Sequence, residues 1–136
     1  MRDTSKELDF VPDTDWRTID ATIVTLAQKK GALEVEIARW LLAAQRERID
    51  RHLGYGSFAE YVQRRLGYDA HVIREKLRVA RALETLPQLG GLLRAGKRSW
   101  SAVREITRIA TAQTEAVWIE TTERMTVREI ENQVRA

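Results

Sequence analysis

Residues 57–86 read SFAEYVQRRLGYDAHVIREKLRVARALETL, and this stretch decides the fold class. Ser57 and Glu60 have the spacing of a capping box, in which the hydroxyl and the carboxylate satisfy free amides at the start of a helix. Gly67 ends that helix, and Asp69 is a good N-cap for the next one. Two helices joined by a short turn that contains glycine have the layout of a helix-turn-helix unit.

The rest of the chain continues the helical pattern. Apolar residues recur three and four positions apart, and no stretch shows sustained alternation of the kind that a strand requires. On the N-terminal side we expect one helix that ends at Gly31 and a second over about 32–53. Short helices follow residue 86. The sequence therefore predicts an all-α fold, a compact bundle of seven or eight short helices containing a helix-turn-helix-like unit.

The chain divides into three expected parts. Residues 1–13 form an acidic N-terminal arm, 14–53 a helical pair suited to oligomerisation, and 54–136 the helix-turn-helix-like domain. The four Trp fall on different helices, mostly on apolar faces, which favours a role in the core.

Composition argues against catalysis. The 136 residues contain no Cys and only two His, so thiolate chemistry and His-based metal sites have almost no ligands. Carboxylate pairs such as Glu34 with Glu36 are two residues apart and point to different sides of a helix. No apolar run approaches the ~20 residues of a membrane span. We expect a cytoplasmic protein that is not an enzyme and has no cofactor, no metal, no small-molecule substrate and no membrane partner.

Positive charge is concentrated in the middle of the chain. Residues 39–108 hold fifteen Lys and Arg against seven Asp and Glu, a surplus of eight, although the whole chain has a net charge of only +3. Residues 1–20 hold six acids and three bases, and residues 109–136 hold five acids and three bases. A basic segment of this kind suits a polyanionic partner.

The second helix of the unit carries the candidate DNA-binding face. His71, Arg74, Arg78 and Arg81 are spaced so that they share one side, and Lys76 lies on a flank. Apolar residues form the opposite side and would anchor the helix while the guanidinium groups reach phosphates or guanine edges. Four further cations are candidates for phosphate contacts, two late in the preceding helix and two just before the Ser99 cap: Arg64, Arg65, Lys97 and Arg98.

Two other interpretations stay open. An Arg-rich helical face can be a solvated surface without a ligand. The first two helices, rich in Trp and aliphatic residues, could instead make the chain an all-helical protein-interaction or dimerisation module that binds no nucleic acid. The leading prediction is a non-catalytic double-stranded DNA-binding protein of helix-turn-helix type that acts as a homodimer, because one short helix reads only a few base pairs.

Several motifs between Leu53 and Val134 resemble a known family. They are LGYGSFAEY at 53–61, the RLG turn at 65–67, LRVARALETLP at 77–87, SWSAVREITRIAT at 99–111 and TVREIE at 126–131. In order and spacing they resemble the helical domain that precedes the nuclease module of many bacterial HNH-endonuclease proteins.

The segment is also similar, more distantly, to the central DNA-binding domain of ParB-type partition proteins. The matching features are the RLG turn, the Gly96-Lys97-Arg98-Ser99 turn with Arg104, and the Val127–Glu131 helix. The Leu86-Pro87 pair comes about one helical turn later than in that family. The resemblance implies a helical, DNA-associated module, and it implies no cleavage activity because the 136 residues contain no nuclease motif.

Overall fold

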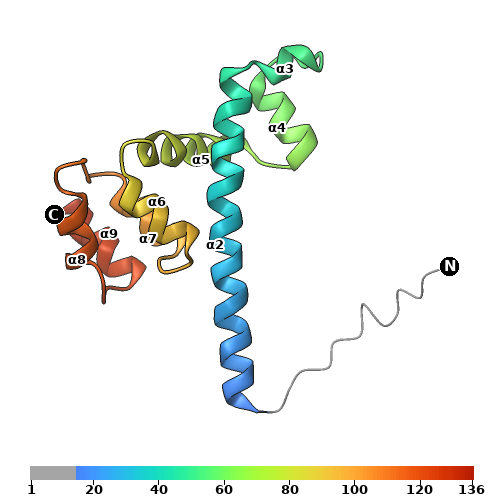
Figure 1. Ribbon diagram of the computed structural model, residues 1–136. Coiled ribbons are helices and arrows are strands. Elements are labelled where there is room, and N and C mark those ends of the chain that lie inside the picture. The colour runs from blue at the N-terminus through green and yellow to red at the C-terminus, as the bar shows by residue number, and fades with distance from the viewer. Residues whose placement is uncertain (1–14) are drawn as a thin grey trace.

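A computed structural model of the chain describes residues 15–136, so the acidic arm predicted over 1–13 lies outside the described residues. The described part is all-helical, as the sequence predicted, and has no strand. Figure 1 shows one long helix with the other helices gathered around its upper half. The helices are α2 (Trp16–Arg46), α3 (Ile49–His52), α4 (Phe58–Leu66), α5 (Ala70–Leu83), α6 (Pro87–Arg94), α7 (Trp100–Ile106), α8 (Glu115–Thr121) and α9 (Val127–Arg135).

The helix end predicted at Gly31 is wrong. α2 is one continuous helix of 31 residues, roughly 46 Å long, and passes straight through this position. Gly31 is buried, and a Cβ built there would lie 3.7 Å from the side chain of Leu93 on α6. The glycine therefore lies in the packed contact between α2 and α6, where a Cβ would meet Leu93 at an ordinary van der Waals distance. A C-cap glycine and a packing glycine look the same in a sequence.

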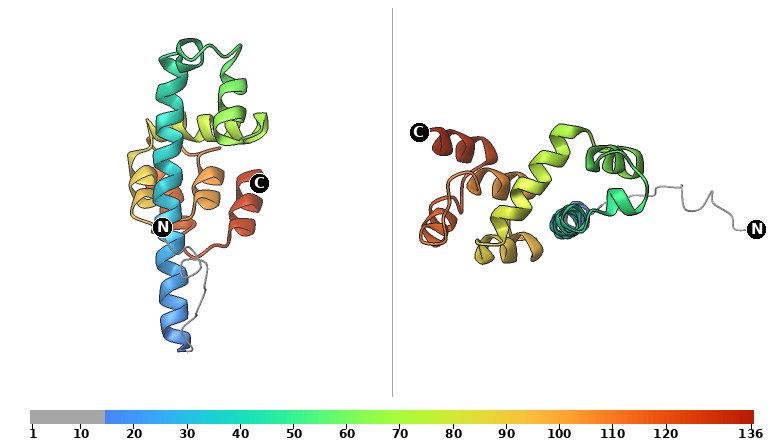
Figure 2. Two further views of the ribbon diagram at one scale, coloured as in Figure 1. Left: turned by 90° about the vertical axis from the view of Figure 1, so that its right-hand side faces the viewer. Right: turned by 90° about the horizontal axis from the view of Figure 1, so that it is seen from above.

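The core has two clusters that meet on α5. In one cluster Val79 and Leu83 pack with apolar residues of α2, α6, α7 and α9. In the other, Ile73 and Leu77 pack against α2 and against the fully buried Val62 of α4. Seen from above in Figure 2, α5 passes close beside α2, with α6–α9 on one side of α2 and α3 and α4 on the other. α5 is thus fixed along its apolar face.

The apolar residues of α2 do not all join this core. Trp16 and Trp40 are 67% and 71% exposed, against the prediction that the Trp residues mostly serve the core. Trp100 and Trp118 are half-buried and do pack against it. The buried residues of α2 all lie between Gly31 and Leu42. The N-terminal half of the helix extends beyond the other helices (Figure 1).

Candidate nucleic-acid interface

The two-helix unit has the local structure that its sequence predicts. The Ser57 hydroxyl accepts from the Glu60 amide at 3.0 Å, and the Asp69 carboxylate accepts from the Val72 amide at 2.9 Å, so each side chain caps its helix. Gly67, the C-cap of α4, has φ of 72°, in the left-handed region that favours glycine. These caps set where α5 begins and in which direction it leaves the turn.

α4 meets α5 through Val62. A compact helix-turn-helix usually has a small residue four positions before the turn glycine, and here that position is Gln63. Gln63 is exposed, so its side chain does not separate the two helices, while its carbonyl accepts from the Gly67 amide at 2.9 Å. The fully buried Val62 beside it supplies the packing contact. The larger side chain at position 63 is therefore compatible with the packed unit.

Three residues of the predicted face are exposed along α5. His71 and Arg74 lie in the first half of the helix, and Arg74 has no hydrogen-bond or ion-pair partner among residues 15–136. Arg81 is exposed near the end of α5 and donates to Gln45 Oε1 of α2 at 2.6 Å. These three side chains surround an open hollow that Gln45 also lines.

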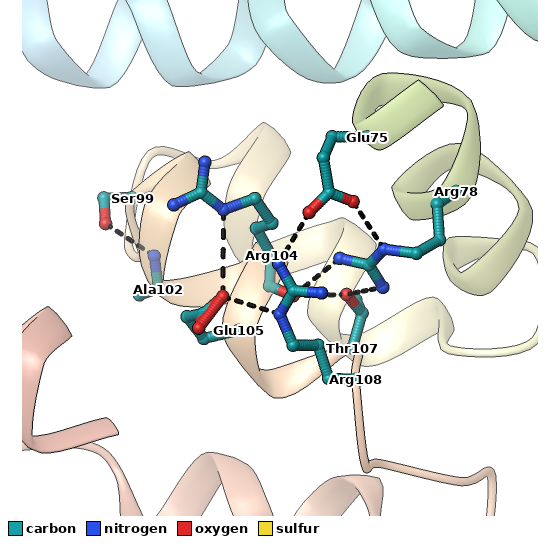
Figure 3. A network of polar contacts seen from close by, with 8 residues as sticks. All are labelled: Glu75, Arg78, Ser99, Ala102, Arg104, Glu105, Thr107 and Arg108. Carbon is teal, nitrogen blue, oxygen red and sulfur yellow. Dashed lines mark hydrogen bonds and ion pairs between the residues drawn. The ribbon is translucent and has the colours of Figure 1, made fainter. Parts of the chain in front are cut away.

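Arg78 faces the same hollow but is held by the protein itself (Figure 3). Its Nε donates to Glu75 at 2.7 Å, and its two terminal nitrogens donate to the Thr107 hydroxyl at 3.3 Å and the Arg104 carbonyl at 3.2 Å. The side chain is 33% exposed. Arg78 therefore joins α5 to the end of α7, and its charge is already partly neutralised.

Glu75 is the centre of this network. Its other oxygen accepts from Arg108 at 2.6 Å, and Arg108 also donates to Glu105 at 2.8 Å (Figure 3). Burial by itself would raise the pKa of Glu75, but the hydrogen bonds and charges of Arg78 and Arg108 outweigh it and hold that pKa below its ordinary value. The carboxylate therefore stays charged at neutral pH.

Lys76 lies away from the predicted face. Its ammonium sits 4.9 Å from the ring centre of Trp100 and 5.3 Å from that of Tyr68, so it makes cation–π contacts on the α7 side of α5. Burial lowers the pKa of Lys76, an effect that Glu34 of α2 opposes and Lys30 reinforces. Lys76 is thus half-buried beside Trp100 and Tyr68, apart from the exposed side chains of His71, Arg74 and Arg81.

The four predicted phosphate contacts separate into two places. Arg64 and Arg65 are exposed beside the turn, where Arg64 pairs with Glu60 at 3.2 Å and Arg65 donates to the Tyr55 hydroxyl at 3.2 Å. Both can add to the charge around the start of α5. We infer this from their common position at the end of α4.

Lys97 and Arg98 lie elsewhere. Their loop packs beside Gln28 of α2, whereas the α5 hollow is lined by Gln45, seventeen residues or roughly 25 Å further along the same helix. Lys97 is exposed, but Arg98 donates to the Ile119 carbonyl at 2.7 Å and the Thr122 hydroxyl at 3.0 Å. Arg98 thus links the start of α7 to α8, and this pair does not join the α5 cations.

Sequence reasoning missed the residues that tertiary packing brings to α5. Gln45 holds Arg81, and Arg108 with Thr107 completes the network around Glu75. Gln45 lies 36 residues before Arg81, and Arg108 lies 33 residues after Glu75. No local spacing in the sequence therefore links the members of either pair. The local signals, caps and periodicity, report only on a residue's own helix.

Among residues 15–136, no three His, Asp or Glu side chains lie close enough together to hold a metal ion. Within that range, no helix combines the length and the apolar character needed to cross a bilayer.

Comparison with known proteins identifies a family. No curated protein and no solved structure matches the chain. One family, described as "Domain of unknown function (DUF222)", matches residues 20–136. In bacterial proteins this domain sits N-terminal to HNH nucleases, in agreement with the resemblance found in the sequence. Because the match spans most of its length, the chain belongs to the DUF222 family.

Proposed function

We propose that this protein is a non-catalytic, double-stranded DNA-binding module in which α5 enters the major groove. The observation that carries the proposal is Arg74, an exposed guanidinium without a partner among residues 15–136, in the half of α5 nearest the helix-turn-helix turn. Recognition helices of this type contact base edges with their N-terminal residues. His71 and Arg81 flank it on the same side.

The proposed contacts are fewer than the sequence suggested. We assign DNA contact to His71, Arg74 and Arg81, which line one hollow, and to Arg64 and Arg65 in the last turn of α4. Arg78 is a positioning residue, because its bonds to α7 keep α5 in place. Lys76 and Arg98 have structural roles in this proposal, and Lys97 lies too far from α5 to share a groove with it.

The likeness to ParB-type partition proteins and the link to HNH nucleases support the same function. We propose that the module brings a cytoplasmic protein to DNA, as a homodimer, and that it contributes no cleavage itself. A pair of α5 helices would read two half-sites, which compensates for the small number of contacts in each.

The test is fluorescence anisotropy with a labelled random-sequence duplex, starting at about 50 mM salt and increasing. We expect binding whose salt slope falls by about one for Arg74→Ala and again for Arg81→Ala. Arg128→Ala on α9 is the matched control, since Arg128 is also exposed, helical and without a partner within residues 15–136. Absence of binding at the lowest salt, or equal slopes for all variants, contradicts the proposal.

A second candidate is a helical interaction module that binds no nucleic acid. The exposed apolar residues of α2 favour it. The anisotropy experiment separates the two functions, because the second predicts no DNA affinity at any salt concentration.

A further inference from the structure

The outer side of α2 is an apolar surface without a partner in the described chain. Every residue from 16 to 30 is exposed, and the large apolar side chains among them include Ile23 at 60% and Leu26 at 58%. An isolated helix of this length is marginally stable in water. Exposed apolar side chains in a continuous row therefore point to a second surface that covers them.

The spacing of these side chains is that of a coiled coil. Counting from Trp16, the row advances by three and four residues in strict alternation. The a positions are Trp16, Ile23, Lys30 and Ile37, and the d positions are Ile19, Leu26, Leu33 and Trp40. This is about three and a half heptads, enough to indicate a two-stranded seam. We call these eight residues the α2 seam.

Most of the α2 seam lies opposite the face that packs on the protein. Four of the five buried residues of α2, Gly31, Val35, Ala38 and Leu42, fall at b and f positions of the same register, and the fifth, Leu41, is at an e position. Ile37 is the seam residue that packs partly against the core of its own chain. α2 can therefore pack against the helices of its own chain on the side of its buried residues and against a second helix on the side of the seam. At its upper end the seam continues into an open groove of about 270 Å³, where Tyr61 and Leu66 of α4 extend the apolar surface.

Charges beside the seam fit a second copy of the same helix. Lys29 is at a g position and Glu34 at the following e position, so in a parallel pair each Lys29 faces the partner's Glu34. Lys29 is exposed and has no ion pair among residues 15–136, whereas Glu34 is half-buried and its charge also acts on Lys76 of α5. In an antiparallel pair Lys29 would instead face the partner's Lys29, and Asp20 the partner's Glu34. Lys30 is the one polar a residue, of the kind that specifies register at a cost in stability.

We propose that α2 forms a parallel two-stranded coiled coil with a second copy of this chain through the α2 seam. The proposal does not depend on DNA binding. It names the surface through which a homodimer forms and leaves the α5 face uncovered, because that face is on other helices. The seam residues that are most exposed, Trp16 at 67% and Trp40 at 71%, are then the ones that lose most solvent contact.

Molecular mass in solution tests the proposal, measured by light scattering or sedimentation over a range of concentrations. We expect a dimer for the wild type, and a dissociation constant weakened about 100-fold or more by Leu26→Asp, which places two charges in the seam. Thr25→Asp is the matched control, since it adds the same charge one residue away at the exposed c position. Helical circular dichroism above the dissociation range shows whether each variant folds. A monomeric wild type, or a dimer that survives Leu26→Asp, overturns the proposal.

A cysteine cross-link tests the orientation. The chain has no native Cys, so Ile19→Cys introduces a single thiol at a d position. In the parallel pair the two thiols meet and form a disulfide on mild oxidation. In an antiparallel pair they lie roughly 27 Å apart, eighteen residues along the helix, and no disulfide forms. An intact dimer that resists this cross-link rejects the parallel arrangement. Neither result bears on whether the chain binds DNA.

Discussion

α2 and α5 each have an outward face on which one kind of side chain recurs at helical spacing. The two faces differ in how far the rest of the chain contacts those side chains. The outward side of α5 is cationic, but Arg78 within it is bonded to α7 and paired with Glu75. The outward side of α2 is apolar, yet Leu26 and Leu33 remain exposed. A charged face can thus be partly neutralised within the chain, while an apolar face of the same chain stays exposed. Regular spacing shows that a face exists and does not show what covers it.

The largest effect expected from this contrast concerns two leucines. Leu77 of α5 is 4% exposed in the core, whereas Leu26 of α2 is 58% exposed on the seam. We expect Leu77→Ala to lower the free energy of unfolding by about 2–5 kcal/mol at every protein concentration. Leu26→Ala should matter only at concentrations where the dimer forms. Urea denaturation at several protein concentrations measures both. Equal, concentration-independent losses would show that Leu26 is part of the core of a single chain.

A smaller effect distinguishes two arginines of the α5 face. Arg78→Ala removes three hydrogen bonds and leaves the Arg104 carbonyl without this donor, so we expect a loss of about 1–3 kcal/mol in the free energy of unfolding. Arg74→Ala, at an exposed position without a partner within residues 15–136, should stay within about 0.5 kcal/mol. Thermal or urea unfolding of the two variants tests this. If Arg74→Ala is as destabilising as Arg78→Ala, the division of the face into a structural and a free arginine is wrong.

The smallest effect is on pH dependence. The pKa of Glu75 is held below its ordinary value in the folded protein, so its charge stabilises the fold above that ordinary value. The stabilisation is lost as the pH falls through the lowered pKa of the folded state. We expect wild type to exceed Glu75→Gln in unfolding free energy by on the order of 1 kcal/mol at neutral pH, and the difference to shrink in acid. Urea unfolding across a pH series measures it, with Glu123→Gln, exposed and without a partner in residues 15–136, as the control. A difference that is constant with pH contradicts the assignment.

Much of the fold was predictable because its signals are local. The Ser57 and Asp69 caps, the left-handed Gly67 and the apolar spacing of Ile73 and Leu77 each depend on residues within a few positions of one another. The family match over 20–136 agrees with the motifs that suggested it. The candidate site was predictable in part, since His71, Arg74 and Arg81 are exposed on α5 as their spacing indicates.

The misses have a common cause. Gly31 looked like a helix end and instead lies inside α2, packed beside Leu93 of α6. Arg98 looked free and bonds to the Ile119 carbonyl, and Trp40 looked buried and is exposed. In each case the deciding neighbour, or its absence, lies on another helix.

The sequence alone was enough to predict that the chain is all-helical, where most of its helices begin, and which side of α5 is cationic. These features were predictable because hydrogen bonding at helix ends and the helical period of 3.6 residues act within one or two turns. Packing between helices decided that α2 is continuous, that Arg78 serves α7, and that the apolar row on α2 faces outward. The partners of Arg78 are 26 and 29 residues away in the sequence. The Arg46–Glu84 pair, which joins α2 to the end of α5, spans 38 residues. Such distances in sequence are closed only when the whole chain folds.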